Sequence, residues 1–198
     1  MFKKHGGFYM PIKIYIDQGH NPSGFNTGAE GNGYYEQDIT YEIGRRLYNL
    51  LRTNPEFTPR LSRPTSETVL GTSNSTSLVE RVNQANSWPA DIFISLHNNA
   101  ATNENATGNE ALVYGPGQRV ANDLAARILE QLTLTTGLRN RGIVYRPGLY
   151  VLKETRMPAV LVEMGFISNP YDADLLANSP YLFATGIYRG ILQYYGLL

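Results

Sequence analysis

Along the chain, segments whose hydrophobic pattern is typical of strands alternate with segments whose pattern is typical of helices. The first change from one pattern to the other comes early. Residues 12–17, IKIYID, form a short run rich in β-branched and aromatic residues, which predicts a strand. The turn-rich stretch that follows, DQGHNPSGFNTGAEGNG, predicts a long loop, and such a loop inside a compact domain is usually functional. After this loop, apolar residues recur at helical spacing, as at Ile39, Ile43 and Leu47, so residues 36–52 are predicted to form an amphipathic helix.

Strands and helices continue to alternate towards the C-terminus. The pattern predicts strands at 58–61, 91–96, 110–114, 149–153 (LYVLK) and 158–163 (PAVLVE), and helices at 77–87, 117–134 and 180–195. Near-continuous apolar strands separated by helices indicate a sheet that is covered on both faces. We therefore expect residues 1–198 to form a single three-layer α/β/α domain with a mostly parallel or mixed central sheet, and residues 1–11 to be a loosely ordered N-terminal segment.

The composition supports a folded domain and argues against two classes of partner. With 42% hydrophobic and 17% charged residues the chain is close to the globular norm, so it should fold alone. Its 17 basic residues balance its 17 acidic ones, so charge alone would draw it neither to nucleic acid nor to an anionic membrane. The N-terminal MFKKHGGFYMPIK lacks the apolar stretch of a signal peptide, and no apolar run is long enough to cross a bilayer. We expect no nucleic-acid partner, no membrane span and no signal peptide in the chain.

Four ionisable residues lie at ends of these elements. His20 and His97 follow the runs IKIYID and IFISL, Glu163 ends the run AVLVE, and Glu36 lies where the first loop becomes a helix. In open α/β sheets, ligands bind outside the carboxyl ends of the strands. We therefore expect these four side chains to converge on one edge of the sheet.

The residue types at this edge suit metal-assisted hydrolysis. Because the chain has no cysteine, zinc would have to be held by imidazole and carboxylate groups. Two imidazoles and one carboxylate leave the fourth position of zinc open to water, and zinc lowers the pKa of that water. A remaining carboxylate can accept the proton of the water and pass it to the leaving nitrogen. Glu163 suits this role, although a salt bridge to Arg156 or Lys153 would also explain its position.

Each candidate ligand also has an ordinary structural explanation. His20 could belong to a turn, His97 could be a hydrogen-bonded strand end, and Glu36 could be a favourable acid in a first helical turn. The intervals between them match no short zinc motif, and H-E-x-x-H is absent. The residues alone therefore leave a metal site and a purely structural set both open. We assign no role to His5, near the N-terminus.

Four blocks in a fixed order carry a family resemblance from about Lys13 to the C-terminus. They are IYIDQGHNPSGFNTGAEGNGYYEQD, DIFISLHNNA, GNEALVYGP and LYVLKETRMPAVLVEMGFISNPYDADLL. The chain resembles the zinc-dependent N-acetylmuramoyl-L-alanine amidases of the type-3 class, which are found in bacterial autolysins, spore-cortex enzymes and phage endolysins. The resemblance implies one catalytic domain that hydrolyses the amide between the lactyl group of N-acetylmuramic acid and the L-alanine of the peptidoglycan stem peptide.

Carried over to this sequence, the resemblance implies particular roles for the same four residues. His20, Glu36 and His97 would be the ligands of Zn²⁺, and Glu163 would be the catalytic acid and base. The enzyme would act at the cell wall on peptidoglycan, with an activator or targeting protein as a further possible partner, and the oligomeric state is left open. Two alternatives remain: a zinc peptidase or amidohydrolase that cuts another peptidoglycan bond, and a non-catalytic wall-binding regulator with the same fold.

The first histidine turn departs from the family pattern, which has Pro before the Gly and a second Gly after the His. Here these positions hold Gln18 and Asn21, a change that could alter how the substrate approaches. Asn32, Asn98 and Arg156 are candidates for binding the substrate, each with capping, a flexible loop or surface pairing as an ordinary alternative. Asn99 is a similar candidate.

Overall fold

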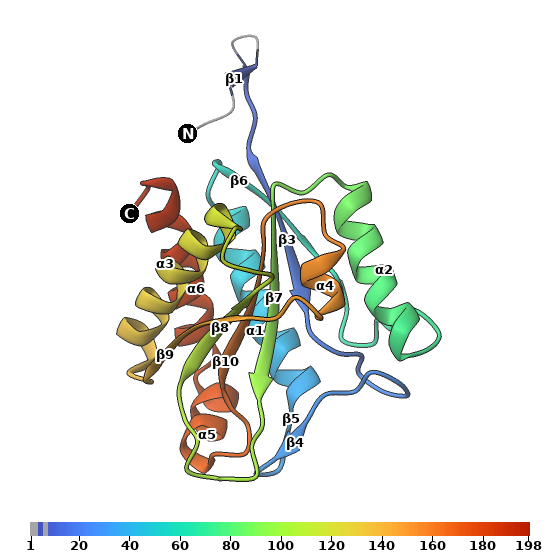
Figure 1. The fold of residues 1–198 in the computed structure, drawn as a ribbon, viewed down its shortest axis with the longest axis vertical. Helices are drawn as coiled ribbons and strands as arrows, with labels where there is room; N and C mark the ends of the chain where they lie inside the picture. Colours follow the sequence, from blue (N-terminus) through green and yellow to red (C-terminus); the bar gives the residue numbers. More distant parts are fainter. Residues whose placement is uncertain (1–3, 6–7) are drawn as a thin grey trace.

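A mixed sheet forms the middle layer of the computed structural model, which describes residues 4–5 and 8–198 (Figure 1). Within this part of the chain, six strands pair in the order β6-β3-β7-β10-β8-β9. Strands β6, β3, β7 and β10 run parallel to one another, whereas β8 is antiparallel to β10 and parallel to β9. Their bounds are β3 Ile12–Gln18, β6 Phe57–Leu61, β7 Ile92–Asn99, β8 Asn109–Val113, β9 Asn140–Tyr145 and β10 Ala159–Phe166.

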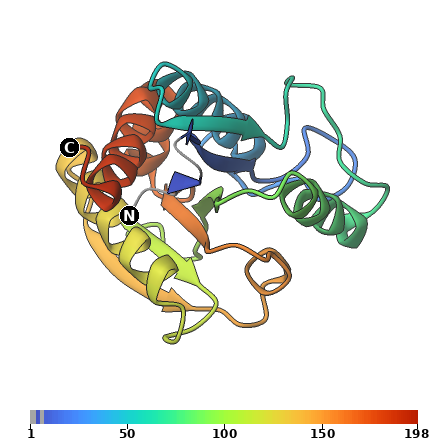
Figure 2. The same ribbon diagram turned by 90° about the horizontal axis from the view of Figure 1, so that it is seen from above.

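Helices cover both faces of this sheet, as viewed from above in Figure 2. One face packs against α1 (Glu36–Arg52), α3 (Arg119–Thr136) and α6 (Pro180–Tyr195), and the other against α2 (Asn74–Ser87) and the short α4 (Tyr150–Lys153). A further helix, α5 (Pro170–Asn178), follows the end of β10. The expectation of a three-layer α/β/α domain with a mixed sheet is confirmed.

Side chains of the central strands alternate between the two cores, and this places the site residues. In β7, Ile94 packs in the core under α1, α3 and α6, and Phe93 in the core under α2 and α4. His97 lies four residues after Phe93 and therefore projects from the face that α2 covers. By the same alternation Glu163 lies on the face of Leu161, which belongs to that second core. The two side chains share one face near the carboxyl ends of neighbouring strands.

The helix predictions are confirmed, with shifts of a few residues at two of them. Helix α1 has the predicted bounds. Helix α2 begins three residues before the predicted start because Ser73 caps it. The hydroxyl of Ser73 accepts from the backbone N–H of Thr76, and the side chain of Thr76 accepts from the backbone N–H of Ser73. Helix α3 ends at Thr136, because Gly137 follows it with a positive φ of 72°.

The predicted strand at 149–153 is wrong, because residues 150–153 form the helix α4. The backbone N–H groups of Lys153 and Glu154 donate to the carbonyls of Leu149 and Tyr150, four residues earlier in each case. Val151 and Leu152 are buried in the core under α2. A short apolar run can be buried as either element, so its pattern does not distinguish a strand from one helical turn.

Strand β9, helix α5 and the hairpin of β4 and β5 have no counterpart among the predictions. Strand β9, NRGIVY, is an edge strand with exposed and half-buried residues, and its apolar run is short. Helix α5 is capped by Asn169, whose side chain accepts from the backbone N–H groups of Tyr171 and Asp172, and it has Pro at its first position. A hairpin of β4 (Glu30–Gly31) and β5 (Tyr34–Tyr35) interrupts the predicted long loop.

The expected loosely ordered segment, residues 1–11, falls partly outside the described residues, which exclude 1–3 and 6–7. Within it, β1 (Lys4–His5) and β2 (Phe8–Tyr9) form a small antiparallel pair. In the part of the chain that the structure covers, no helix combines the length and apolarity needed to cross a membrane.

Candidate metal centre

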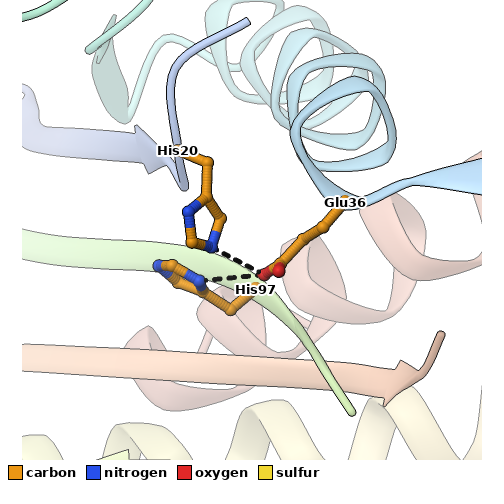
Figure 3. Close-up of side chains that lie close together, drawn as sticks. All are labelled: His20, Glu36 and His97. Atoms are coloured by element: carbon orange, nitrogen blue, oxygen red, sulfur yellow. Dashed lines mark hydrogen bonds and ion pairs between the residues drawn. The ribbon is translucent and has the colours of Figure 1, made fainter. Parts of the chain in front are cut away.

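Three of the four candidate residues meet at the carboxyl edge of the sheet (Figure 3). His20 lies two residues after β3, His97 near the end of β7, and Glu36 at the first position of α1. The Glu36 Oε1 atom lies 3.1 Å from Nε2 of His20 and 3.0 Å from Nδ1 of His97. One ligand atom of each residue lies within 4.8 Å of the other two, so the group could bind a metal ion.

The backbone around His20 is shaped to turn its ring towards this point. His20 has a positive φ of 69°, a conformation that is uncommon for a residue with a side chain. Its Nδ1 atom lies 3.2 Å from the carbonyl oxygen of Asn26. When a metal replaces the proton that Nε2 shares with Glu36, this carbonyl would accept from an N–H on Nδ1 and fix the tautomer in which Nε2 binds the metal. Gly19 is required beside it, because a Cβ there would lie 2.6 Å from Cε1 of His97.

Glu36 is held in place by four contacts to its two oxygens. In addition to the two imidazoles, Oε1 accepts from the backbone N–H of Asn98 at 2.9 Å, and Oε2 from that of Ala29 at 2.9 Å. Burial by itself raises the pKa of this carboxyl group, but the hydrogen bonds from His20 and His97 outweigh burial and leave the pKa well below its ordinary value. Glu36 is therefore ionised, as a metal ligand must be.

Glu163 lies beside this group, and the described residues form no salt bridge with its carboxylate. It is in register with His97 on β7 and with Glu110 on β8. Its Oε2 atom is buried without a hydrogen-bond partner among the described residues. Burial, and then the charges of Glu36 and Glu110, raise the pKa of Glu163 to about 8.

The salt bridge considered for Glu163 is not formed in the described part of the chain. Lys153 is paired with Glu154 at 3.1 Å, and the backbone N–H of Arg156 donates to Asn86. Arg156 precedes the amino end of β10, whereas the metal group lies at the carboxyl end. The structure thus does not bring Arg156, a predicted substrate contact, to this group.

The other two predicted substrate contacts have structural roles close to the group. Asn32 and Gly33 form the turn of the β4–β5 hairpin with φ values of 53° and 79°, as expected for an Asn-Gly hairpin, and Asn32 Nδ2 donates to the carbonyl of Ile167 at 2.9 Å. Asn98 supports Glu36 through its backbone N–H, but its side chain is buried, with its amide unpaired among the described residues. Asn99 Nδ2 donates to Glu110.

The two departures in the histidine turn face the protein interior. Gln18 is fully buried, donates to the carbonyl of Tyr41 and accepts from the backbone N–H of Arg63. Asn21 is also fully buried and exchanges hydrogen bonds with both backbone groups of Leu70. Their side chains therefore fasten the turn to neighbouring loops and do not line a path for the substrate.

One functional candidate is absent from the sequence predictions. Arg81 on α2 is 1% exposed, and its guanidinium group contacts the turn that carries His20. A signal was present: Arg81 lies three residues after Leu78 and four before Ala85, on the apolar stripe of the predicted helix, where an unpaired charge is rarely buried.

The fold and the site together define a class of protein: α/β/α hydrolases with a group that could bind a metal ion and a buried carboxylate beside it. Residues 14–193 match the family model of the N-acetylmuramoyl-L-alanine amidases. The chain belongs to this family, the type-3 amidases, and the resemblance drawn from the four sequence blocks is confirmed.

Named relatives and solved structures agree with this assignment. The chain is 36% identical over 190 residues to the N-acetylmuramoyl-L-alanine amidase CwlM of Bacillus licheniformis, covering 94% of this chain and 70% of CwlM. It is 38% identical over 188 residues to LytC of Bacillus subtilis, covering 92% of this chain but 35% of LytC, so it spans about a third of that relative. The crystal structure of an amidase from Clostridium difficile 630 superposes with a TM-score of 0.84 at 29% identity, covering 94% and 97% of the two chains.

Proposed function

We propose that this chain hydrolyses the amide bond between the lactyl group of N-acetylmuramic acid and L-alanine in peptidoglycan, with Zn²⁺ held by His20, Glu36 and His97. The observation that carries the proposal is the convergence of these three side chains beside Glu163, whose Oε2 atom has no hydrogen-bond partner among the described residues, in a chain of the amidase family. The chemical types of these side chains, their arrangement and the family of the chain all favour the same reaction.

The three residues suit zinc by the number, type and spacing of their ligand atoms. In a tetrahedral site with ligands at roughly 2.1 Å from zinc, ligand atoms lie about 3.4 Å apart. The two measured distances from Glu36 Oε1 to the imidazole nitrogens, 3.1 and 3.0 Å, are close to this spacing. When bound, zinc would activate water and polarise the scissile carbonyl.

The residues of the chain then divide the remaining work. Glu36 brings a negative charge to the site, and Asn26 and Ala29 orient the ligands through their backbone groups. Glu163 would accept the proton of the attacking water on Oε2 and donate it to the leaving nitrogen of L-alanine. This oxygen is buried and has no hydrogen-bond partner in the part of the chain that the structure describes, so it is available for both transfers.

We propose further that residues 1–198 act as one catalytic domain at the cell wall. An activator or targeting protein is also proposed as a partner, since CwlD of Clostridioides difficile, solved in complex with the GerS lipoprotein, superposes with a TM-score of 0.82 at 25% identity. The equilibrium between free and complexed protein can be measured by sedimentation once a partner is in hand.

The test is a digest of purified peptidoglycan, analysed by mass spectrometry and by labelling of new amino groups. We expect stem peptides with a free L-alanine amine, no release after treatment with a chelator, and recovery when zinc is added. Cleavage inside the stem peptide would assign the other zinc peptidase reaction. Absence of release from both vegetative wall and spore cortex would leave the non-catalytic regulator as the correct description.

Two variants make this digest specific to the site. Glu163→Gln should retain zinc and lose turnover by a factor of about 10²–10⁴, the usual contribution of a general acid and base. Glu154→Gln is the matched control, because Glu154 is an exposed carboxylate paired with Lys153. Equal activity of the Glu163→Gln protein and this control would refute the role of Glu163.

A further inference from the structure

A buried arginine, Arg81, joins helix α2 to the turn that carries the first metal-ligand candidate. Its Nη1 atom donates to Oδ1 of Asp17 and to the carbonyl of Gln18, each at 2.6 Å. Its Nη2 atom donates to the carbonyl of His20 at 2.6 Å and to Oδ1 of Asn21 at 3.4 Å. One guanidinium group therefore binds four of the five residues from 17 to 21.

Asp17 is the carboxylate that pairs with the charge of Arg81. Asp17 is 1% exposed, and its second oxygen accepts from the hydroxyl of Ser95 at 2.7 Å. The carboxylate is thus held by β7 and by Arg81 together. Because the guanidinium is planar and its donors point in fixed directions, the position of the Asp17 carboxylate also determines where Arg81 holds the carbonyl of His20.

The conformation that these bonds hold is one that the chain would otherwise rarely adopt. His20 has a φ of 69°, and a non-glycine residue in this region persists where surrounding contacts fix it. Helix α2 supplies the other contacts as well: Asn26, whose carbonyl faces Nδ1 of His20, is bound through its own amide groups to Asn74 and Ser77. The orientation of the His20 ring therefore depends on α2 at two points.

We propose that Arg81 is the positioning residue of the metal centre, which holds the strained backbone of His20 so that Nε2 faces Glu36 and His97. This inference deepens the proposed function and rests on His20 being a ligand. It assigns a role at the site to a residue that would not contact zinc or the substrate. Groups that orient metal ligands in this way usually contribute 10- to 100-fold to metal affinity.

A purely structural role for Arg81 would give a different result, so both folding and metal binding must be measured. We would determine the zinc affinity of the whole chain by competition with a chromogenic chelator, the visible spectrum of the Co²⁺-loaded protein, and the unfolding of the metal-free protein in urea. The variants are Arg81→Lys, which keeps the charge and loses the planar fork, and the double variant Asp17→Asn/Arg81→Met, which removes both charges of the buried pair together.

The matched control is Asp172→Asn, which changes a buried carboxylate whose hydrogen bonds involve neither the His20 turn nor Arg81. Asp172 is fully buried and accepts from the hydroxyl of Thr107 and the backbone N–H groups of Gly108 and Phe166. Like Arg81, it ties a helix to strands and loops of the sheet. It should lose stability without a change in the zinc affinity of the folded protein.

We expect both Arg81 variants to bind zinc at least about 10-fold more weakly when folded, with a changed Co²⁺ spectrum. Wild-type affinity and spectrum in either folded variant would overturn the inference, as would an equal loss of affinity in Asp172→Asn. If neither Arg81 variant folds, the residue serves the fold as a whole and the inference is also overturned. Failure of the wild-type chain to bind zinc would instead refute the proposed function.

Discussion

Replacing Glu163 by glutamine should change how the stability of the metal-free protein depends on pH. In the folded protein, burial and the charges of Glu36 and Glu110 raise the pKa of Glu163 from 4.5 to about 8. As pH rises through this window, the unfolded chain releases the proton first, so the folded state loses stability between about pH 4.5 and 8. Glutamine has the same shape and no proton to lose, so the variant escapes this loss.

The magnitude follows from the shift in pKa at about 1.4 kcal/mol per unit. Between roughly pH 5.5 and 8.5 the Gln variant should gain about 3 kcal/mol relative to wild type. The assay is urea unfolding of both proteins in chelator at the two pH values, and contributions of groups that do not interact with Glu163 cancel in the difference. A difference that stays constant with pH, or one that falls, would refute the environment that we assign to Glu163.

Three further changes test other parts of the structure. Gly19→Ala should weaken zinc binding at least about 10-fold, because the new Cβ would lie 2.6 Å from Cε1 of His97. Gly115→Ala, whose new Cβ would have no atom within 4 Å, should leave zinc binding unchanged, and competition with a chelator measures both variants. Asp17 has a pKa below its ordinary value because its guanidinium partner and a serine hydroxyl outweigh burial. Asp17→Asn should therefore lower the free energy of unfolding by about 3–5 kcal/mol near neutral pH, and this loss should shrink as pH falls below about 4. An equal loss at both pH values in urea unfolding would contradict the pairing. Ser73→Ala should cost about 0.5–2 kcal/mol in thermal unfolding, since it removes the cap of α2, and no change would contradict the cap.

Sequence patterns predicted most of the sheet and the main helices, because burial imposes a period on them. In residues 36–52, apolar residues recur every three to four positions on the side of α1 that faces the core. The bounds of this helix were therefore predicted correctly. Strand β9 lies at an edge and carries no such pattern, and the run at 149–153 is too short to distinguish a helical turn from a strand. Polar or short elements are positioned by contacts with distant residues, which no local pattern records.

The candidate metal group was also predictable, since strand ends meet at one edge of a parallel sheet. The contacts that hold this group in place were not predictable, because they depend on the directions in which side chains and backbone groups point. The turn at Gln18 and Asn21 was expected to affect the substrate, yet both side chains are buried and bind loops. Arg81 is 61 residues from His20 in sequence, and only folding brings its guanidinium to the carbonyl of that residue.

The most direct test of the central claim is the position of zinc in a crystal of the metal-loaded protein, located by anomalous scattering at the zinc edge. We expect one peak at about 2.0–2.2 Å from Nε2 of His20, Nδ1 of His97 and a carboxylate oxygen of Glu36, with Glu163 beside it but not bound to it. A peak at other residues, or none in crystals soaked with excess zinc, would contradict the account.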